Sequence, residues 1–323
     1  IDAGSARHDP ADPRPRRLNA RAPTEAPDVI AELRHCPAPA KLNLFLHVTG
    51  RRPDGYHLLE TVFELIDLSD SLGFTRLEDG RIERAGTVGG VPADADLTVR
   101  AARLLAERSG CRLGVRIEID KRIPMGGGLG GGSSDAATTL LALNRLWDLN
   151  WPRRRLARLA LTLGADVPVF VFGRAAYATG IGERLRPLAL PARAYVLVAP
   201  RVAVPTAGVF AAPELTRDTK PLKISGLSRG EQVFRGRNDL QRVVVSRQPK
   251  VAEALEALRQ AAREAGLNAG AARMTGSGAC VFLPLHGESD AHRVRDRLAG
   301  RIDADVSVCR SLATHPLRDW AFE

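Results

Sequence analysis

The sequence predicts an α+β fold built from two domains. Three observations carry this prediction: strand-like alternation of apolar and polar residues recurs along the chain, amphipathic helical segments separate many of these strands, and the first two strands form a hairpin. The length of 323 residues suits about two domains. A content of 44% hydrophobic and 26% charged residues is ordinary for a folded protein, and it excludes a fully disordered chain, a collagen-like repeat and a polytopic membrane protein.

Residues 1–36 are set apart from the folded body. They are rich in Pro, Ala, Arg and Asp, they show no hydrophobic period, and their six arginines balance six acidic residues. We therefore expect a disordered extension over residues 1–36. A first domain over 37–190 and a second over 191–323 are expected to follow.

The first folded element is predicted to be a β-hairpin. Between residues 40 and 48, leucines and a valine occupy every second position, which predicts a strand whose other face carries Lys41 and Asn43. A Pro-Asp-Gly turn follows, and the apolar run over 58–68 predicts the returning strand.

The remaining elements mix helices and strands. In chain order we expect a helix over 96–109, a strand over 115–119, helices over about 133–147 and 153–163, an apolar strand over 166–172, a strand over 194–199, a helix over 251–265, a strand over 279–285, a helix over 289–299 and a strand over 304–309.

The glycine-rich loop over 126–132 is the most informative segment of the sequence. Six of its seven residues are glycine, so side chains do not obstruct the approach of a ligand to the backbone. Successive N–H groups followed directly by a helix N-terminus form a phosphate site. Ser133 and Ser134 stand where the helix cap is expected, and their hydroxyls could reach a phosphate or its Mg²⁺. The structural alternative is a glycine turn that only caps the helix.

Two common nucleotide-binding patterns do not explain this loop. The Walker pattern requires a lysine directly before the serine, and Gly132 stands before Ser133. The Rossmann pattern G-x-G-x-x-G does occur from Gly126, but six glycines satisfy many patterns by accident. Residues 121–124 also separate the loop from the preceding strand.

Three motifs in matching order resemble the GHMP kinases. Residues 124–134 are similar to the phosphate loop of that family, residues 39–44 to its first motif, and residues 274–282 to a second glycine loop near the C-terminus. The likeness covers residues 37 to about 315. It departs from the family at two positions, and these leave the substrate contacts nearby open: Ala207 and Gln241.

Further strings resemble the branch of the family that phosphorylates the 2-hydroxyl of 4-diphosphocytidyl-2-C-methyl-D-erythritol, a step toward isoprenoid precursors. They are residues 41–44, 52–57, 164–168 and 238–240. The resemblance implies a two-domain kinase with its active site in the cleft between the domains. It also implies ATP with Mg²⁺ as cofactor and a small molecule as substrate. The Mg²⁺ should arrive with ATP, because the sequence shows no carboxylate cage and no metal-ligating residue is expected.

The resemblance implies Lys41 and Asp166 as the catalytic residues. Asp166 would accept the proton of the substrate hydroxyl, and Lys41 would orient it and stabilise the emerging alkoxide. The apolar residues after Asp166 are expected to desolvate its carboxylate. A solvent-exposed lysine and an ordinary turn aspartate are the alternatives for either residue taken alone.

The resemblance also implies two groups of binding residues. Those for ATP are Pro124, Met125, Gly126, Gly127, Gly128, Leu129, Gly130, Gly131, Gly132, Ser133 and Ser134. Those for the substrate are Asn43, Tyr56, His57, Thr206 and Phe210. Tyr56 and Phe210 are expected to sandwich a cytosine whose edge bonds to His57, unless both aromatic rings belong to the core. Asn238 with Asp239 is expected to cap a helix and brace the site.

The net charge of +10 leaves other function classes open. Because 42 of the 47 basic residues are arginine, the excess indicates codon bias more than a binding face. It suits anionic substrates, while a basic nucleic-acid-binding protein is the alternative from another class. A GHMP kinase of the homoserine or mevalonate type and a dinucleotide-dependent oxidoreductase are two more. We expect no nucleic-acid or membrane partner, a cytoplasmic monomer or weak homodimer, and four reduced cysteines.

Overall fold

A long β-hairpin opens the folded part of the chain in the computed structural model, which describes residue 1 and residues 30–222 and 232–323. β1 (Glu32–Arg51) pairs antiparallel with β2 (His57–Leu77). In the turn, the N–H of Gly55 donates to the carbonyl of Arg52 at 3.0 Å, and Gly55 has φ +91°, which glycine adopts without strain. The predicted hairpin is confirmed.

β1 starts within the segment that the sequence assigned to the extension. Its first residue is Glu32, whereas the extension was expected to run to residue 36. Leu33 pairs with Phe74 and Cys36 with Leu72 of β2, so this start is held by a ladder that local spacing could not reveal. Residues 2–29 of the expected extension lie outside the described residues.

The elements that follow the hairpin agree with the predicted order up to residue 161. They are α1 (Leu97–Ser109), β4 (Gly114–Asp120), α2 (Gly131–Leu146) and α3 (Arg153–Leu161). A three-residue strand that was not predicted, β3 (Ile82–Arg84), precedes them. Asp96 caps α1, because its carboxylate accepts the N–H of Thr98 at 2.8 Å. α2 packs against α1, α4 and the hairpin.

The apolar run that was expected to be a strand over 166–172 is a helix, α4 (Val167–Phe172). Pro168 lies in its first turn, and Gly173 ends it with φ +71°. α4 packs against α2 and α3, so tertiary packing overrides the strand propensity of its valine and phenylalanine residues.

The second half of the described chain alternates strands with helices. Its elements are β5 (Ala176–Thr179), β6 (Arg184–Pro187), β7 (Ala194–Pro200), α5 (Thr206–Phe210), α6 (Asp239–Arg247), α7 (Pro249–Glu264), β8 (Arg273–Met274), β9 (Val281–Leu285), α8 (Glu288–Leu298) and β10 (Ala304–Leu312). The predicted strands and helices of this half are confirmed, including the helix, α6, that Asn238 was expected to cap. β5, β6, β8 and the short α5 were not predicted.

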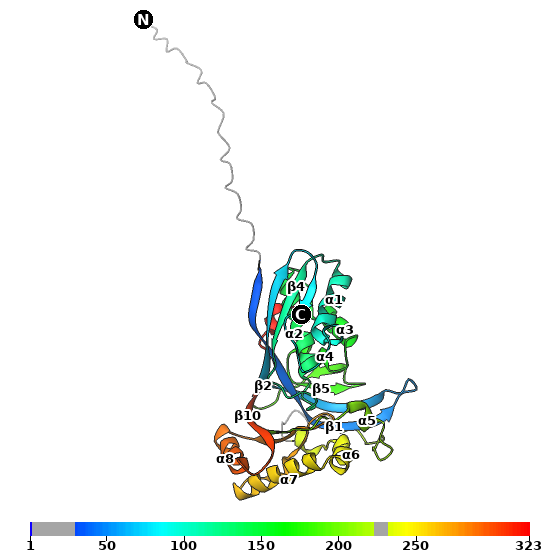
Figure 1. Cartoon of the computed structure of the whole chain (residues 1–323), viewed down its shortest axis with the longest axis vertical. Helices are drawn as coiled ribbons and strands as arrows, with labels where there is room; N and C mark the ends of the chain where they lie inside the picture. Colours follow the sequence, from blue (N-terminus) through cyan, green and yellow to red (C-terminus); the bar gives the residue numbers. More distant parts are fainter. Residues whose placement is uncertain (2–29, 223–231) are drawn as a thin grey trace. The chain divides into compact units, whose positions relative to one another are not determined.

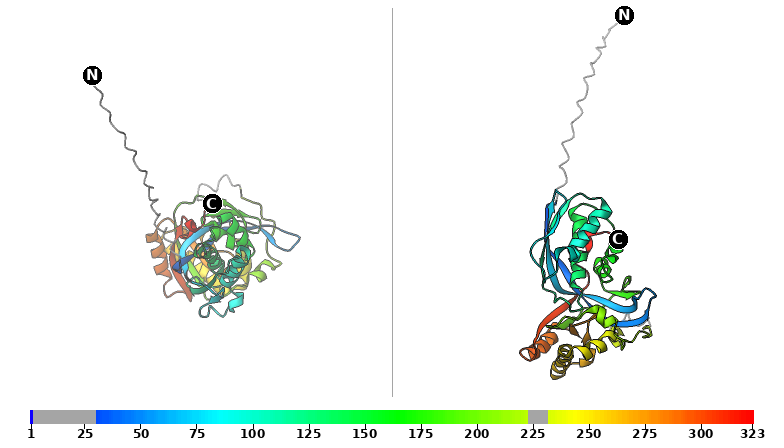
Figure 2. Two further views of the ribbon diagram at one scale, coloured as in Figure 1. Left: turned by 90° about the horizontal axis from the view of Figure 1, so that it is seen from above. Right: turned by 45° about the vertical axis from the view of Figure 1, so that its right-hand side comes forward.

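The strands join into one mixed sheet. Its order is β3-β4-β2-β10-β7-β9-β8, with β1 also paired to β2 and with β5 linking β2 to β6. All these pairs are antiparallel except β3 with β4. Figures 1 and 2 show α7 and α8 side by side, and both helices pack against β7 and β9. The helices α1 to α4 lie beside the upper part of the hairpin in Figure 1.

The hairpin contributes to two cores at once. Leu46 and Val48 belong to a buried cluster with residues of β7, α7 and α8, while Leu42 and Leu44 pack in a second cluster with Tyr195 of β7. β1 also contacts both α2 and α6. The mixed helix and sheet content is that of the predicted α+β class, and the domain division after residue 190 stays a prediction.

The last residues of the chain pack against its first half. His315 donates its N–H to the carbonyl of Gly173 at 2.8 Å. The buried guanidinium of Arg153 donates to the carbonyls of Val171, Arg318 and Ala321. The C-terminal tail thus fixes the end of α4, the helix that follows Asp166.

Candidate active site

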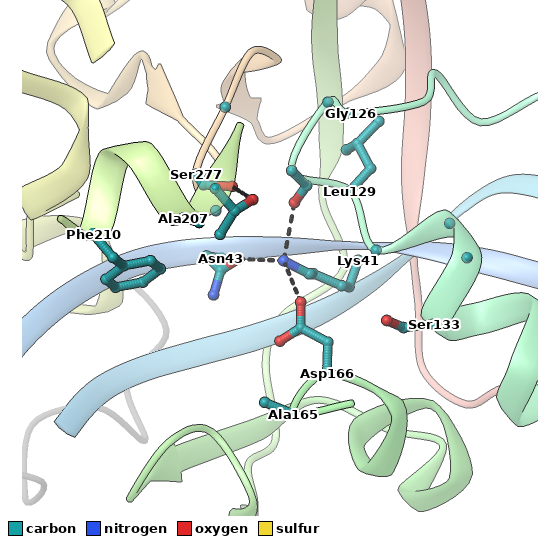
Figure 3. Close-up of a pocket in the computed structure, with 18 of the residues that line it drawn as sticks. Lys41, Asn43, Gly126, Leu129, Ser133, Ala165, Asp166, Ala207, Phe210 and Ser277 are labelled. Atoms are coloured by element: carbon teal, nitrogen blue, oxygen red, sulfur yellow. Dashed lines mark hydrogen bonds and ion pairs between the residues drawn. The ribbon is translucent and has the colours of Figure 1, made fainter. Parts of the chain in front are cut away.

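Lys41 lies at the centre of the site, on β1. Its Nζ donates to Asn43 Oδ1 at 2.6 Å and to the carbonyl of Gly128 at 2.9 Å, and it forms an ion pair with Asp166 Oδ2 at 3.4 Å (Figure 3). The side chain is only 3% exposed. Its three bonding directions are therefore each taken by a different segment: the same strand, the glycine loop and the start of α4.

Asp166 stands at the N-cap position of α4, with a partly open carboxylate. Its side chain is 39% exposed, while the side chains of Val167, Val169 and Phe170 are buried in the core. The expectation that these apolar residues desolvate the carboxylate is wrong, because the helix turns them inward and leaves Asp166 at the cavity wall.

The glycine loop crosses the second glycine loop at close range. Gly128 has φ +76°, and a Cβ placed there would lie 2.3 Å from the carbonyl oxygen of Thr275. The amides of Ala279 and Cys280 donate to the carbonyls of Gly126 and Gly127 at 3.2 and 3.1 Å. The two loops resembling family motifs thus form one hydrogen-bonded unit, which only glycine permits at this distance.

The two serines do not cap the helix as expected. α2 begins at Gly131 with Gly130 at the N-cap, so both serines lie inside its first turn. The hydroxyl of Ser134 is buried and donates to the carbonyl of Pro39 at 2.7 Å, away from the cavity. Ser133 does line the cavity.

Beyond the glycine loop, Lys121 connects two buried carboxylates. Its Nζ donates to Asp135 at 2.7 Å and also to Asp70. Asp70 in turn accepts the N–H groups of Arg122 and Ile123 at 2.6 and 2.8 Å. Burial acts to lower the pKa of Lys121, but the charges and hydrogen bonds of the two carboxylates outweigh it and raise this pKa.

Aromatic residues gather at the opposite end of the cavity. The rings of His57 and Phe210 lie with centroids 5.0 Å apart at 33°, whereas Tyr56 is 60% exposed. Within the described ranges, the aromatic ring that contacts Phe210 is therefore His57 and not Tyr56. Burial, followed by the charges of Arg217 and Arg51, lowers the pKa of His57.

One cavity of about 1070 Å³ brings the candidate residues together. Of the residues that the sequence singled out for catalysis, ATP or substrate, Ser134 is the one that does not line it.

Asn238 caps α6 by accepting the N–H of Leu240, and its amide donates to the carbonyls of Met274 and Gly276 at 2.9 and 2.8 Å. It therefore supports the second glycine loop from below, as expected of a bracing residue.

Several residues that line the cavity escaped the sequence reasoning. They are Arg51, Val88, Val91, Lys121, Asp135, Arg217 and Ser277, among others. Ser277 lies in the third motif and donates to or accepts from Thr206 at 2.7 Å, so the motif itself was its signal. Val88, Val91 and Arg217 lie in irregular segments, where no period or spacing marks them.

Two features common in other proteins are missing from the described ranges. None of the helices there combines the length and apolar character that crossing a membrane requires. Over the same ranges no three histidine, cysteine, aspartate or glutamate side chains cluster closely enough to bind a metal ion.

Comparison with known proteins identifies the family of this chain. The model of the GHMP kinase N-terminal domain matches residues 96–174, and that of the GHMP kinase C-terminal domain matches residues 225–303. The chain is 55% identical over 291 residues to a 4-diphosphocytidyl-2-C-methyl-D-erythritol kinase from Aromatoleum aromaticum, covering 90% of this chain and 98% of the relative. It is equally similar to the protein of that name from Cupriavidus metallidurans, covering 90% and 97%.

Solved structures show the same likeness. A crystal structure of 4-(cytidine 5'-diphospho)-2C-methyl-D-erythritol kinase is 38% identical and superposes with a TM-score of 0.68, covering 86% of this chain and 98% of that one. The homoserine kinase of Cytophaga hutchinsonii, at 17% identity, shares the fold with a TM-score of 0.65 over 91% and 98% of the two chains. This chain therefore belongs to the GHMP kinase family of ATP-dependent small-molecule kinases.

Proposed function

We propose that the protein transfers the γ-phosphoryl group of ATP to the 2-hydroxyl of 4-diphosphocytidyl-2-C-methyl-D-erythritol, on the route to isoprenoid precursors. The support is the identity of 55% over nearly the whole length of relatives with that name. The structural observation that supports phosphoryl transfer is the Lys41–Asp166 ion pair, which lies beside a glycine loop suited to binding phosphate.

The reaction needs a proton acceptor, and Asp166 is suited to that role. The substrate hydroxyl would give its proton to Asp166 while its oxygen attacks the γ-phosphorus in line, and the bond to the bridging oxygen of ADP breaks. Lys41 binds Asp166 Oδ2 and holds it toward the cavity. Its positive charge also lies where the alkoxide develops, and a preorganised charge of this kind stabilises the transition state.

The glycine loop and α2 supply the phosphate site. Residues 126–132 line the cavity and, apart from Leu129, bring no side chain that would obstruct a phosphate. The sixteen-residue α2 starts at the same place, so its positive N-terminal end is available to the phosphates. The Mg²⁺ that accompanies ATP would neutralise charge on the phosphates. Among the described residues, Ser133 offers a hydroxyl at this point, and phosphate and water oxygens would supply most of the other ligands of the ion.

The aromatic end of the cavity suits the cytidine. Tyr56 and Phe210 would stack on the base, and His57 would bond to its edge. Asn43 would meet the substrate near the reacting hydroxyl. Its Oδ1 already accepts from Lys41, and its Nδ2 donates to Thr61 at 2.9 Å, which leaves one amide hydrogen for a ligand. Thr206 would contact the substrate from α5.

Coupled measurement of ADP release tests this function. With 4-diphosphocytidyl-2-C-methyl-D-erythritol the purified chain should turn over with a kcat typical of small-molecule kinases, on the order of 1–100 s⁻¹. Homoserine and mevalonate should give rates at the level of the ATP-only control. Turnover of either alcohol in the absence of turnover of the cytidine compound would assign the chain to another reaction.

A further inference from the structure

Arg217 links the two elements that carry His57 and Phe210, which lie far apart in the sequence. Its Nε donates to Nε2 of His57 at 3.1 Å. Its two Nη atoms donate to the carbonyls of Phe210, Ala212 and Leu215 at 3.1, 2.7 and 3.0 Å. The guanidinium thus joins the end of α5, which carries Phe210, to the first residue of β2.

This contact decides which nitrogen of His57 carries the hydrogen. A guanidinium has only donors, so Nε2 of His57 must accept with its lone pair. A neutral imidazole then holds its hydrogen on Nδ1. The ring is kept neutral because burial and the charges of Arg217 and Arg51 lower its pKa. Nδ1 has no hydrogen-bond partner among the described residues, and the ring lines the cavity, so Nδ1–H is the group left for a ligand.

A hydrogen on Nδ1 of His57 would distinguish cytosine from uracil. N3 of cytosine carries a lone pair and accepts a hydrogen bond, whereas N3 of uracil carries a hydrogen. A fixed Nδ1–H donor pairs with the first and opposes the second, and burying two opposed donors leaves both unsatisfied.

We propose that Arg217 is a specificity-determining residue that holds His57 as the Nδ1–H tautomer and so makes the site select cytosine over uracil. The inference rests on the proposed function, since it concerns the base of the same substrate. Arg217 acts as a positioning residue, because it reaches the base through His57. By also binding the carbonyls of Phe210 and Ala212, it keeps the His57 donor and the Phe210 ring at a constant spacing.

The tautomer can be measured without any turnover. In the full chain labelled with ¹⁵N-histidine, long-range ¹H–¹⁵N spectra distinguish Nδ1–H from Nε2–H, and His57→Gln identifies the signal among the seven histidines. We expect His57 as Nδ1–H in the unsubstituted chain and mainly as Nε2–H in Arg217→Met. An Nε2–H signal for His57 in the unsubstituted chain would overturn the inference.

The selectivity is measured as the ratio of kcat/KM for the cytidine substrate and its uridine analogue. The ratio should be about 100 or more in the unsubstituted chain and fall below about 10 in Arg217→Met, because His57 can then switch tautomer. Arg242→Met, an exposed arginine of α6, is the matched control and should keep the ratio. A purely structural role of Arg217 would lower both kcat/KM values equally, and an unchanged ratio in Arg217→Met would therefore contradict the inference.

The two proposals can fail separately. If the unsubstituted chain turns over neither compound, the proposed function fails, and the spectrum of His57 still decides whether Arg217 holds the tautomer. If the cytidine compound is turned over but the uridine analogue is used equally well, the function stands and the inference about Arg217 is wrong.

Discussion

Nζ of Lys41 and Oδ2 of Asp166 lie 3.4 Å apart, although one residue belongs to the first strand and the other to the cap of α4. The lysine is buried, whereas the aspartate is partly open to the cavity. The pair is therefore asymmetric: the cation is held by three protein contacts and the carboxylate keeps an accessible side for a substrate. Such an arrangement suits the proposed role of Asp166 as the acceptor of the substrate proton.

Replacing Lys41 by Met should lower kcat strongly with a smaller effect on ATP binding. Met keeps roughly the length of the side chain but removes the charge that pairs with Asp166 and that is proposed to stabilise the alkoxide. Losing one preorganised stabilising group costs about 10²- to 10³-fold in kcat. Steady-state kinetics on the cytidine substrate measure this, and a thermal melt checks the fold. A kcat reduced by less than about tenfold would show that Lys41 is not part of the reaction.

Gly128→Ala should raise KM for ATP. A side chain there must tolerate φ +76° and would clash with the carbonyl of Thr275 at 2.3 Å, so the loop has to move. A strained φ of this kind costs roughly 1–3 kcal/mol, and we expect KM to rise at least about tenfold. Gly287→Ala is the matched control, since a Cβ there meets nothing within 4 Å and its φ is −143°. Equal ATP KM values in the two variants would refute the proposed role of the loop.

Tyr56→Ala should affect the substrate alone. Because this side chain is largely exposed, its removal should leave the melting temperature and the KM for ATP unchanged. Loss of stacking on a base costs about 1–3 kcal/mol, which corresponds to a rise of roughly 5- to 150-fold in KM for the cytidine compound. Tyr56→Phe retains the ring and should behave like the parent. If Tyr56→Ala leaves that KM unaltered, the base does not stack on this ring.

Glu64→Gln should stabilise the protein more at pH 8 than at pH 5. Glu64 of β2 accepts the hydroxyl of Tyr195 of β7, and burial raises the pKa of Glu64 to about 7. An unfolded glutamate has a lower pKa, so the folded state binds the extra proton between about pH 4 and pH 7 and loses stability as the pH rises through that window. Glutamine carries no such penalty and still accepts the hydroxyl.

The size of that effect is measurable by denaturant unfolding at both pH values. The difference in unfolding free energy between Glu64→Gln and the parent should grow by roughly 1–3 kcal/mol from pH 5 to pH 8. A difference that stays constant, or that shrinks over this range, would show that Glu64 is ionised in the folded protein at low pH.

Local patterns predicted the elements whose packing agrees with their own periodicity. The alternation around Lys41 and the spacing over residues 96–109 both gave elements that the structure contains. α4 was taken for a strand because its valine and phenylalanine residues favour one, and only its contacts with α2 and α3 make it a helix. The start of β1 at Glu32 likewise depends on pairing with β2.

The sequence predicted the site residues that belong to a motif. It did not predict the residues and contacts that only the folded structure brings together. Lys41 and the glycine loop were found from motifs, whereas their contact with each other is set by three-dimensional packing. Ser134 belongs to the motif, yet its hydroxyl faces Pro39 because α2 starts earlier than a serine cap would place it. Arg217 carries no sequence signal at all, since its role comes from the carbonyls and the imidazole around it.

Single-turnover phosphoryl transfer by Asp166→Asn tests the central claim most directly. Asparagine keeps the size of the side chain but cannot take up the substrate proton, so the rate should fall by about 10²- to 10⁴-fold, while the Kd for ATP changes little. Combining it with Lys41→Met should lower the rate by much less than the product of the two single effects, because the two groups act as a unit. An Asp166→Asn rate equal to that of the parent, with both substrates saturating, would contradict the account.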